Sequence, residues 1–149
     1  MAVTRPKKAK AERSPIKLVL KDTRLKKFVL DVLLPVEEAG KGRTELSYGI
    51  GLPPEIDIND CSAILSIKGK GVSKIDSSKV AFTFDTELAG LFSLSRNPSD
   101  EEIELLSIDM ADLIAPVLSD TIETAMFKTG YPRLRIPKSF PPSNIDGNK

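Results

Sequence analysis

Histidine is absent from the sequence, and Cys61 is its only cysteine. Without histidine there is no Ser-His-Asp or Cys-His nucleophilic site, no histidine-ligated zinc and no imidazole proton shuttle. One cysteine excludes an internal disulfide and a cysteine cluster for zinc or an iron–sulfur centre. The glycines form no G-x-x-x-x-G-K-[ST] loop of the kind that cradles nucleotide phosphates. These absences exclude the most familiar enzyme chemistries before any motif is considered.

Long apolar runs are missing as well. No segment is long enough to span a bilayer, and residues 1–27 lack the apolar stretch of a secretory signal. An unpaired cysteine is typical of a reducing compartment. Together these observations predict a cytoplasmic location.

A histidine-free enzyme is the alternative that these absences leave open. The acids Asp109 and Asp112, and likewise Asp120 and Glu123, lie three residues apart in the sequence. Such neighbours share one face of a helix. Catalysis would require acids that converge in a pocket, which spacing does not indicate. We interpret these pairs as solvated helix surface.

Charge is present in nearly equal amounts of both signs, but it is unevenly distributed. The 149 residues have a net charge of +1, yet residues 1–27 carry ten Lys or Arg against two Asp or Glu. The remaining 122 residues carry twelve basic and nineteen acidic side chains. We expect residues 1–15 to be a disordered basic arm, 16–140 to be a single domain, and 141–149 to be a flexible tail.

The basic arm raises a second functional hypothesis, a nucleic-acid-binding module that contacts phosphates. The competing interpretation is a solubilising tail. Its lysines are not interleaved with aromatic residues, and charge alone provides no base readout. The sequence therefore favours the solubilising tail over a nucleic-acid partner.

Alternating apolar residues predict strands in the first half of the domain. Leu46, Tyr48, Ile50 and Leu52 share one face of a strand over 45–52, which Pro53 ends. Further strands are expected over 62–72 and 79–86, and a short one from Ile16 to Lys21. Residues 25–36 are apolar without a clear period, and we expect them to be extended. Short turns favour antiparallel pairing.

Helical spacing replaces this alternation after residue 97. Ser99 and Glu102 have the spacing of a capping box, and an apolar stripe follows them. Pro116 predicts a break or kink, with a second helix after it and Gly130 as its C-cap. The pattern predicts an α+β fold: a four-stranded antiparallel sheet followed by two helices packed on one face.

Two segments resemble the SecB family of protein-export chaperones. Residues 82–94, FTFDTELAGLFSL, resemble the family's fourth-strand signature F-x-C-E-V-x-x-x-G-I-F-x-I, with Phe82, Gly90 and Phe92 in place. Residues 116–140 resemble the stretch P-Y-A-R-E-x-I…G-x-F-P-x-L-x-L…F, in which Pro116 and Phe140 keep their order. The two segments are collinear with those of the family.

The resemblance implies a cytosolic homotetramer, a dimer of dimers, that holds unfolded polypeptides for export without ATP, cofactor or catalysis. It also implies a polypeptide-binding groove and an oligomer interface. By position, the groove would be lined by Phe28, Tyr48, Ile50, Leu52, Ile122, Met126 and Tyr131. The interface would use the first helical stripe, at Ile103, Leu106 and Met110. Each of these apolar side chains is equally well explained as core, because burial alone favours it. Phe82 and Phe84 are expected in the core rather than the groove.

Members of the family that deliver clients to the SecA motor carry acids on the outer face of the sheet. The corresponding acids here would be Asp22, Asp85 and Glu87, but Lys26 stands where a further acid is expected. A charge reversal within such a patch opposes a basic partner. The resemblance therefore leaves two kinds of client: exported proteins delivered to SecA, or one dedicated partner such as an antitoxin.

Overall fold

The structure is a computed structural model that describes residues 15–39, 42–74, 76, 78–131 and 134–140. Residues 1–14 of the expected basic arm and the expected tail 141–149 lie outside the described residues, so the nucleic-acid hypothesis stays untested. The elements, in chain order, are β1 (Leu18–Val32), α2 (Val36–Ala39), β2 (Gly42–Gly51), β3 (Cys61–Ser73), β4 (Val80–Leu94), the 3-10 turn η1 (Asp100–Glu102) and α3 (Ile103–Phe127).

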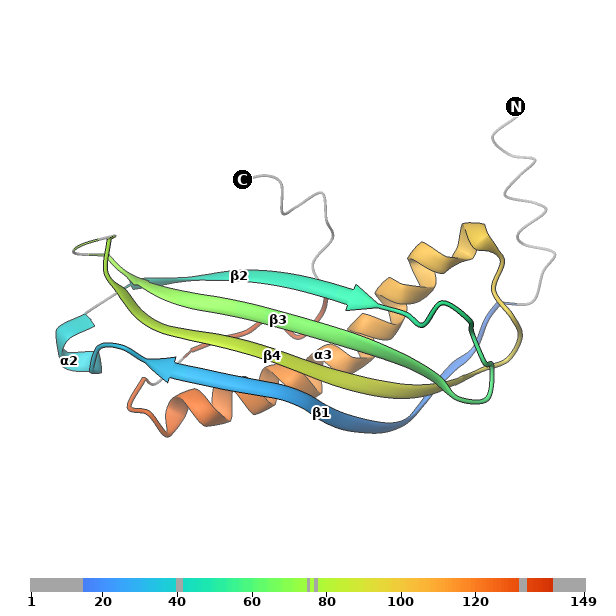
Figure 1. The fold of residues 1–149 in the computed structure, drawn as a ribbon, viewed down its shortest axis with the longest axis horizontal. Coiled ribbons are helices and arrows are strands. Elements are labelled where there is room, and N and C mark those ends of the chain that lie inside the picture. Colours follow the sequence, from blue (N-terminus) through green and yellow to red (C-terminus); the bar gives the residue numbers. More distant parts are fainter. Residues whose placement is uncertain (1–14, 40–41, 75, 77, 132–133, 141–149) are drawn as a thin grey trace, which may run out of the picture.

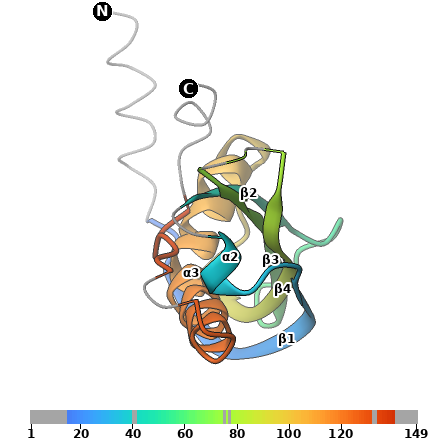
Figure 2. The ribbon, with the colours of Figure 1, turned by 90° about the vertical axis from the view of Figure 1, so that its left-hand side faces the viewer.

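The four strands form one antiparallel sheet in the order β1-β4-β3-β2 (Figure 1). Strands β2, β3 and β4 follow one another, and β1 pairs with the far side of β4. The chain must therefore cross from one edge of the sheet to the other between β1 and β2, and it does so through α2. Helix α3 covers one face of the sheet (Figure 2). The expected fold class, a four-stranded antiparallel sheet with helical structure on one face, is confirmed.

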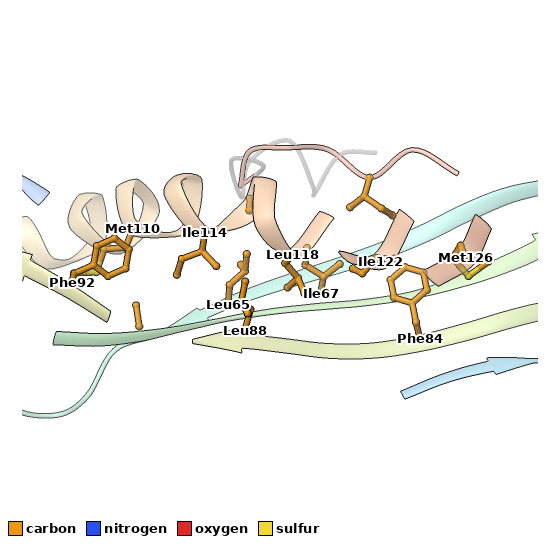
Figure 3. Close-up of a cluster of buried hydrophobic side chains, with 14 of the residues drawn as sticks. Leu65, Ile67, Phe84, Leu88, Phe92, Met110, Ile114, Leu118, Ile122 and Met126 are labelled. Carbon is orange, nitrogen blue, oxygen red and sulfur yellow. The ribbon is translucent and has the colours of Figure 1, made fainter. Parts of the chain in front are cut away.

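The core lies between α3 and the inner face of the sheet. Strand β3 alternates strictly there: Leu65 and Ile67 are fully buried, whereas Ser66 and Lys68 point to the opposite face. From the helix, Met110, Ile114, Leu118, Ile122 and Met126 point into the same layer (Figure 3). Gly90 of β4 makes room for the helix, since a Cβ there would come within 2.8 Å of the Ile114 side chain. The helix can therefore pack directly on the centre of the sheet.

Helix α3 is continuous through Pro116, so the expected break into two helices is wrong. Pro116 faces solvent, and the carbonyl that its missing N–H leaves unpaired can be hydrated. Buried residues on both sides of it, Ile114 and Leu118, pack on the sheet and hold the helix together. The expected capping box is present, although it opens with the turn η1. Gly130 follows the helix with a φ of 95°, as expected of a C-terminal cap.

Strand β1 is one strand of fifteen residues where the sequence pattern predicted two separate extended segments. The register with β4 shifts between Leu20 and Asp22, and again between Leu25 and Lys27. Each shift inserts one extra residue, which reverses the alternation of inward and outward side chains. The pattern therefore loses its period although the strand continues. The segment after β1 contains the single helical turn α2, and β4 runs eight residues further than Thr86, to Leu94.

An ion pair fixes the junction between β4 and α3. The Arg96 guanidinium donates to both carboxylate oxygens of Glu102, at 3.0 and 2.8 Å, and the Ser99 N–H donates to the same carboxylate at 2.8 Å. The bond from Arg96, and after it the one from Ser99, lowers the pKa of Glu102 to about 2. Both donors favour the ionised carboxylate.

The Arg96→Ala variant tests this junction through its pH dependence. Because the pKa of Glu102 is lowered on folding, its stabilisation is present above its ordinary value of 4.5 and is lost as the pH falls towards about 2. The Tm of the variant should therefore lie below that of the wild type at pH 7. The difference should close between pH 4.5 and 2 in thermal melts followed by circular dichroism. A difference that does not change with pH would contradict the assignment.

Candidate functional site

A cavity of about 300 Å³ lies at the end of the sheet, under the crossover from β1 to β2. Its lining comes from α2, from the adjoining ends of β2, β3 and β4, and from the segment after α3. The lining residues are Val36, Ala39, Gly42, Arg43, Thr44, Gly71, Val72, Ser73, Ala81, Phe82, Tyr131 and Leu134. We call this the end cavity.

Aromatic rings form one wall of the end cavity. The Phe82 ring stacks on Phe84 with centroids 6.3 Å apart, and the Tyr131 ring meets Phe82 edge-on at 5.1 Å. Gly71 lies opposite Phe82 in the β3–β4 register, and a Cβ on Gly71 would come within 2.3 Å of the Phe82 ring. The glycine therefore allows the ring to lie flat across the sheet. The resulting wall is apolar, and the Phe82 ring within it is fixed by contacts with Phe84 and with Tyr131.

The crossover above the cavity is fixed by hydrogen bonds. Both Leu33 and Leu34 donate their N–H groups to the carbonyl of Ala81, at 2.8 and 3.0 Å. The Tyr131 hydroxyl donates to the Leu34 carbonyl, and the Ser73 hydroxyl donates to the Ala39 carbonyl at 3.0 Å. The cavity is therefore bounded by fixed backbone rather than by loosely attached side chains.

Charge is confined to the rim of the end cavity. Arg43 is exposed and pairs with Glu45 at 2.9 Å. Burial, and to a smaller extent Glu37, raises the pKa of the Tyr131 hydroxyl. Among the described residues, no group of three His, Cys, Asp or Glu side chains could hold a metal ion. The cavity is suited to take up an apolar side chain, because it offers apolar contact and few polar partners.

Only one of the expected groove residues, Tyr131, lines the end cavity. Phe28, Tyr48 and Ile50 are half-buried on the inner face of the sheet, and Leu52 follows the end of β2. Ile122 and Met126 are fully buried beneath the sheet. Spacing could not distinguish these positions, because core and groove residues share one face of each element. Val36, Phe82 and Leu134 line the cavity, and the sequence analysis did not assign them to a site.

The expected interface residues lie on the inner side of α3. Met110 is fully buried, Leu106 is 4% exposed and Ile103 is half-buried. Exposed apolar residues of α3 lie elsewhere on the helix, at Leu105, Leu113, Val117 and Phe127. A second subunit that binds this helix would contact the latter set first. The interface itself remains a prediction.

The three expected acids lie on the outer face of the sheet, which α3 does not cover. Asp85 pairs with Lys27 of the neighbouring strand at 2.6 Å, and this bond lowers the pKa of Asp85. Glu87 lies two residues further along β4. Asp22 borders a second cavity of about 180 Å³ together with Arg24 and Lys26. Positive charge therefore accompanies the acids, so this face is mixed rather than acidic.

Comparisons with known proteins support the fold. No family model matches the sequence, and no curated protein sequence matches it. Among solved structures, the chain is similar to the Mycobacterium tuberculosis SecB-like chaperone Rv1957, in a complex with a ChAD peptide from the Rv1956 HigA1 antitoxin. The TM-score is 0.68 at 18% sequence identity, covering 84% of this chain and 92% of that chain.

A protein of unknown function from Streptococcus agalactiae is a weaker match, with a TM-score of 0.39 at 15% identity, covering 83% of this chain and 99% of that chain. No described helix is long and apolar enough to cross a membrane.

The resemblance carried by residues 82–94 and 116–140 is confirmed at the level of the fold. This chain has a SecB-like fold.

Proposed function

We propose that this protein is an ATP-independent holdase chaperone that binds non-native polypeptides, with the end cavity as a binding site for apolar client side chains. The observation that carries the proposal is the apolar cavity of about 300 Å³, walled by Phe82 and Tyr131, in a chain of SecB-like fold. The similar SecB-like chaperone is described in complex with a peptide, which supports a polypeptide as the ligand.

Exposed apolar side chains near the cavity support the same proposal. Leu33, in the crossover, is 57% exposed, and Phe127, four residues before Tyr131, is 70% exposed. Figure 1 places α2 and the C-terminal end of α3 at one end of the molecule. Exposed apolar surface beside a pocket is typical of a protein interaction site. Such a surface can bind many sequences, because apolar contact does not require aligned polar groups.

The proposal includes assembly as a cytoplasmic homotetramer, since several weak sites on one oligomer can bind one long client with higher affinity. The mixed charge of the outer face favours a dedicated partner, such as an antitoxin, over a SecA-type motor. Lys27 neutralises Asp85, and Lys26 lies beside Asp22. A basic partner would meet like charge there.

Light scattering of an aggregating client tests the proposal. A heat-labile enzyme, warmed above its melting temperature, should scatter much less light when a stoichiometric amount of this protein is present, without ATP. Albumin at the same mass concentration is the control for nonspecific protection. No suppression at a fourfold excess of the protein would overturn the proposal. A strictly monomeric mass in multi-angle scattering would overturn the tetramer alone.

A further inference from the structure

The second cavity lies on the outer face of the sheet, which α3 leaves uncovered (Figure 2). The pairing register builds it from two neighbouring rows of side chains. Asp22 of β1, Leu91 of β4 and Ser62 of β3 form one row. Arg24 of β1 and Ala89 of β4 belong to the next row. The lining residues of this cavity of about 180 Å³ are Asp22, Thr23, Arg24, Lys26, Ser62, Ala89 and Leu91.

A small side chain forms the floor of the second cavity. Gly90 packs against Ile114 of the helix, so its neighbours Ala89 and Leu91 point to the outer face. Ala89 is 8% exposed and lies opposite Arg24 in the register with β1. Because the Ala89 methyl group is short, the longer side chains beside it enclose a space above it. The floor of the cavity is therefore apolar.

Two bulges in β1 place positive charge beside this floor. The register with β4 shifts at Lys21 and again at Lys26. A bulge changes the direction in which nearby side chains point. Lys21 pairs with Asp60 at 2.8 Å, which ties the first bulge to the residue before β3. Lys26, at the second bulge, instead lines the cavity together with Arg24.

The two cations of the second cavity are not neutralised by an acid. Neither Arg24 nor Lys26 has a side-chain hydrogen bond or ion pair within the part of the chain that the structure describes. By contrast, Lys27 on the same face pairs with Asp85 at 2.6 Å. The acid of the lining, Asp22, accepts a hydrogen bond at 2.9 Å from the backbone N–H of the residue that follows it. Two cations and one acid leave the cavity with one positive charge in excess.

A glutamate side chain of another protein matches this arrangement. A guanidinium group binds a carboxylate through two parallel N–H bonds, and an ammonium group adds a point charge. The Ser62 hydroxyl can donate a further hydrogen bond. The apolar floor suits the methylene groups that separate the carboxylate of glutamate from its backbone, and an inorganic anion has no such groups. The chemistry of the lining therefore favours glutamate over an inorganic anion.

We propose that the second cavity is a docking site for an acidic segment of a partner protein, which inserts a glutamate side chain between Arg24 and Lys26. Charge complementarity identifies this occupant, since the lining has unpaired cations. The proposal goes beyond the proposed function, because the two cavities share no lining residue. The protein can therefore hold a client at the end cavity while an acidic partner occupies the outer face.

Fluorescence anisotropy with an acidic peptide tests the docking site. The probe is fluorescein-labelled GEAEAEAEG, with GQAQAQAQG as its uncharged control, at low ionic strength where exposed charges are least screened. The double variant Arg24→Gln with Lys26→Gln should bind the acidic peptide roughly tenfold or more weakly than the wild type. Both side chains are exposed, so this variant should keep the thermal melt of the wild type.

The matched control is the double variant Lys68→Gln with Lys70→Gln. Both lysines are exposed on β3 and lie outside the lining of the second cavity, so the same charge is removed from the same face. Its affinity for the acidic peptide should stay within about twofold of the wild type. Equal losses in the two double variants would overturn the proposal, because binding would then depend on overall charge. No binding of the acidic peptide to the wild type would overturn it as well.

A change of shape at constant charge gives a second readout. Ser62 is exposed, so the Ser62→Leu variant should fold as the wild type does. Its larger side chain fills part of the cavity, and the acidic peptide should bind roughly fivefold or more weakly. Undiminished binding to Ser62→Leu would overturn the proposal, because the peptide would then not enter the cavity.

The docking site and the holdase function fail separately. If the wild type suppresses client aggregation but does not bind the acidic peptide, the docking site is wrong and the holdase function stands. If the peptide binds and the variants respond as expected, but no client is protected from aggregation, the holdase function is wrong and the docking site stands.

Discussion

Replacing Phe92 with alanine is expected to lower the free energy of unfolding by about 3–5 kcal/mol. Phe92 is fully buried on β4, where it lies between Cys61 of β3 and Leu20 of β1 and faces Met110 of α3 (Figure 3). Removing its ring leaves a void where strands and helix meet, and neighbours fixed by the sheet cannot collapse into it. A domain of this size has roughly 5–15 kcal/mol of total stability, so the loss is a large fraction of it.

The measurement is urea unfolding followed by circular dichroism, with the midpoint expected to fall at an unchanged slope. Phe127→Ala makes the same chemical change at a residue that is 70% exposed, and it should cost less than about 1 kcal/mol. An equal loss of unfolding free energy in the two variants would contradict the packing of α3 on the sheet. The buried ring of Phe92 would then contribute no more to stability than the exposed ring of Phe127.

Replacing Val36 with aspartate is expected to abolish most client binding while leaving the fold intact. Val36 begins α2, lines the end cavity and is only half-buried, so its carboxylate can still reach water in the unliganded protein. An apolar client side chain that enters the cavity would displace that water and leave the carboxylate desolvated. Burying an unpaired carboxylate costs several kcal/mol, so the affinity should fall by roughly 30-fold or more.

Val29→Asp is the matched control for this prediction. Val29 lies on the outer face of the sheet, is 46% exposed and does not line the end cavity, so the same substitution adds the same charge outside the site. Suppression of client aggregation should be lost in Val36→Asp and kept in Val29→Asp, with equal thermal melts for both. Loss of activity in both variants would indicate a general charge effect instead of a site.

The sheet was predictable from the sequence wherever its strands alternate without interruption. Strand β3 alternates from Cys61 to Lys70, and Phe82 and Phe84 of β4 share the inner face as expected. Strand β1 was not recognised as one element, because its two register shifts change which side chains point inwards. Such shifts are set by pairing with β4, a contact between residues sixty or more positions apart, and no local pattern contains it.

The helix illustrates the same limit. Pro116 is a strong local signal for a break, yet tertiary packing at Ile114 and Leu118 keeps α3 continuous. Helical spacing also identified Leu106 and Met110 as apolar positions of one stripe, but spacing alone does not say whether a stripe faces its own sheet or another subunit. The structure places both residues in the core of this chain.

The candidate site was predictable only in part. Tyr131 was recognised through the resemblance of residues 116–140, and it does line the end cavity. Val36 and Leu134 come from segments about a hundred residues apart in the chain, which the crossover and the segment after α3 bring together. One local signal was available: Gly71 leaves space for an aromatic ring on the neighbouring strand, and Phe82 occupies it.

The most direct test of client binding at the end cavity uses the two tyrosines of the sequence, Tyr48 and Tyr131. Protein labelled with 3-fluorotyrosine should give two fluorine resonances, which Tyr48→Phe and Tyr131→Phe assign. On titration with an unfolded client, the Tyr131 resonance should shift or broaden in step with binding measured by anisotropy, because Tyr131 lines the cavity that takes up the client. A client that binds fully while the Tyr131 resonance stays unchanged would contradict the account.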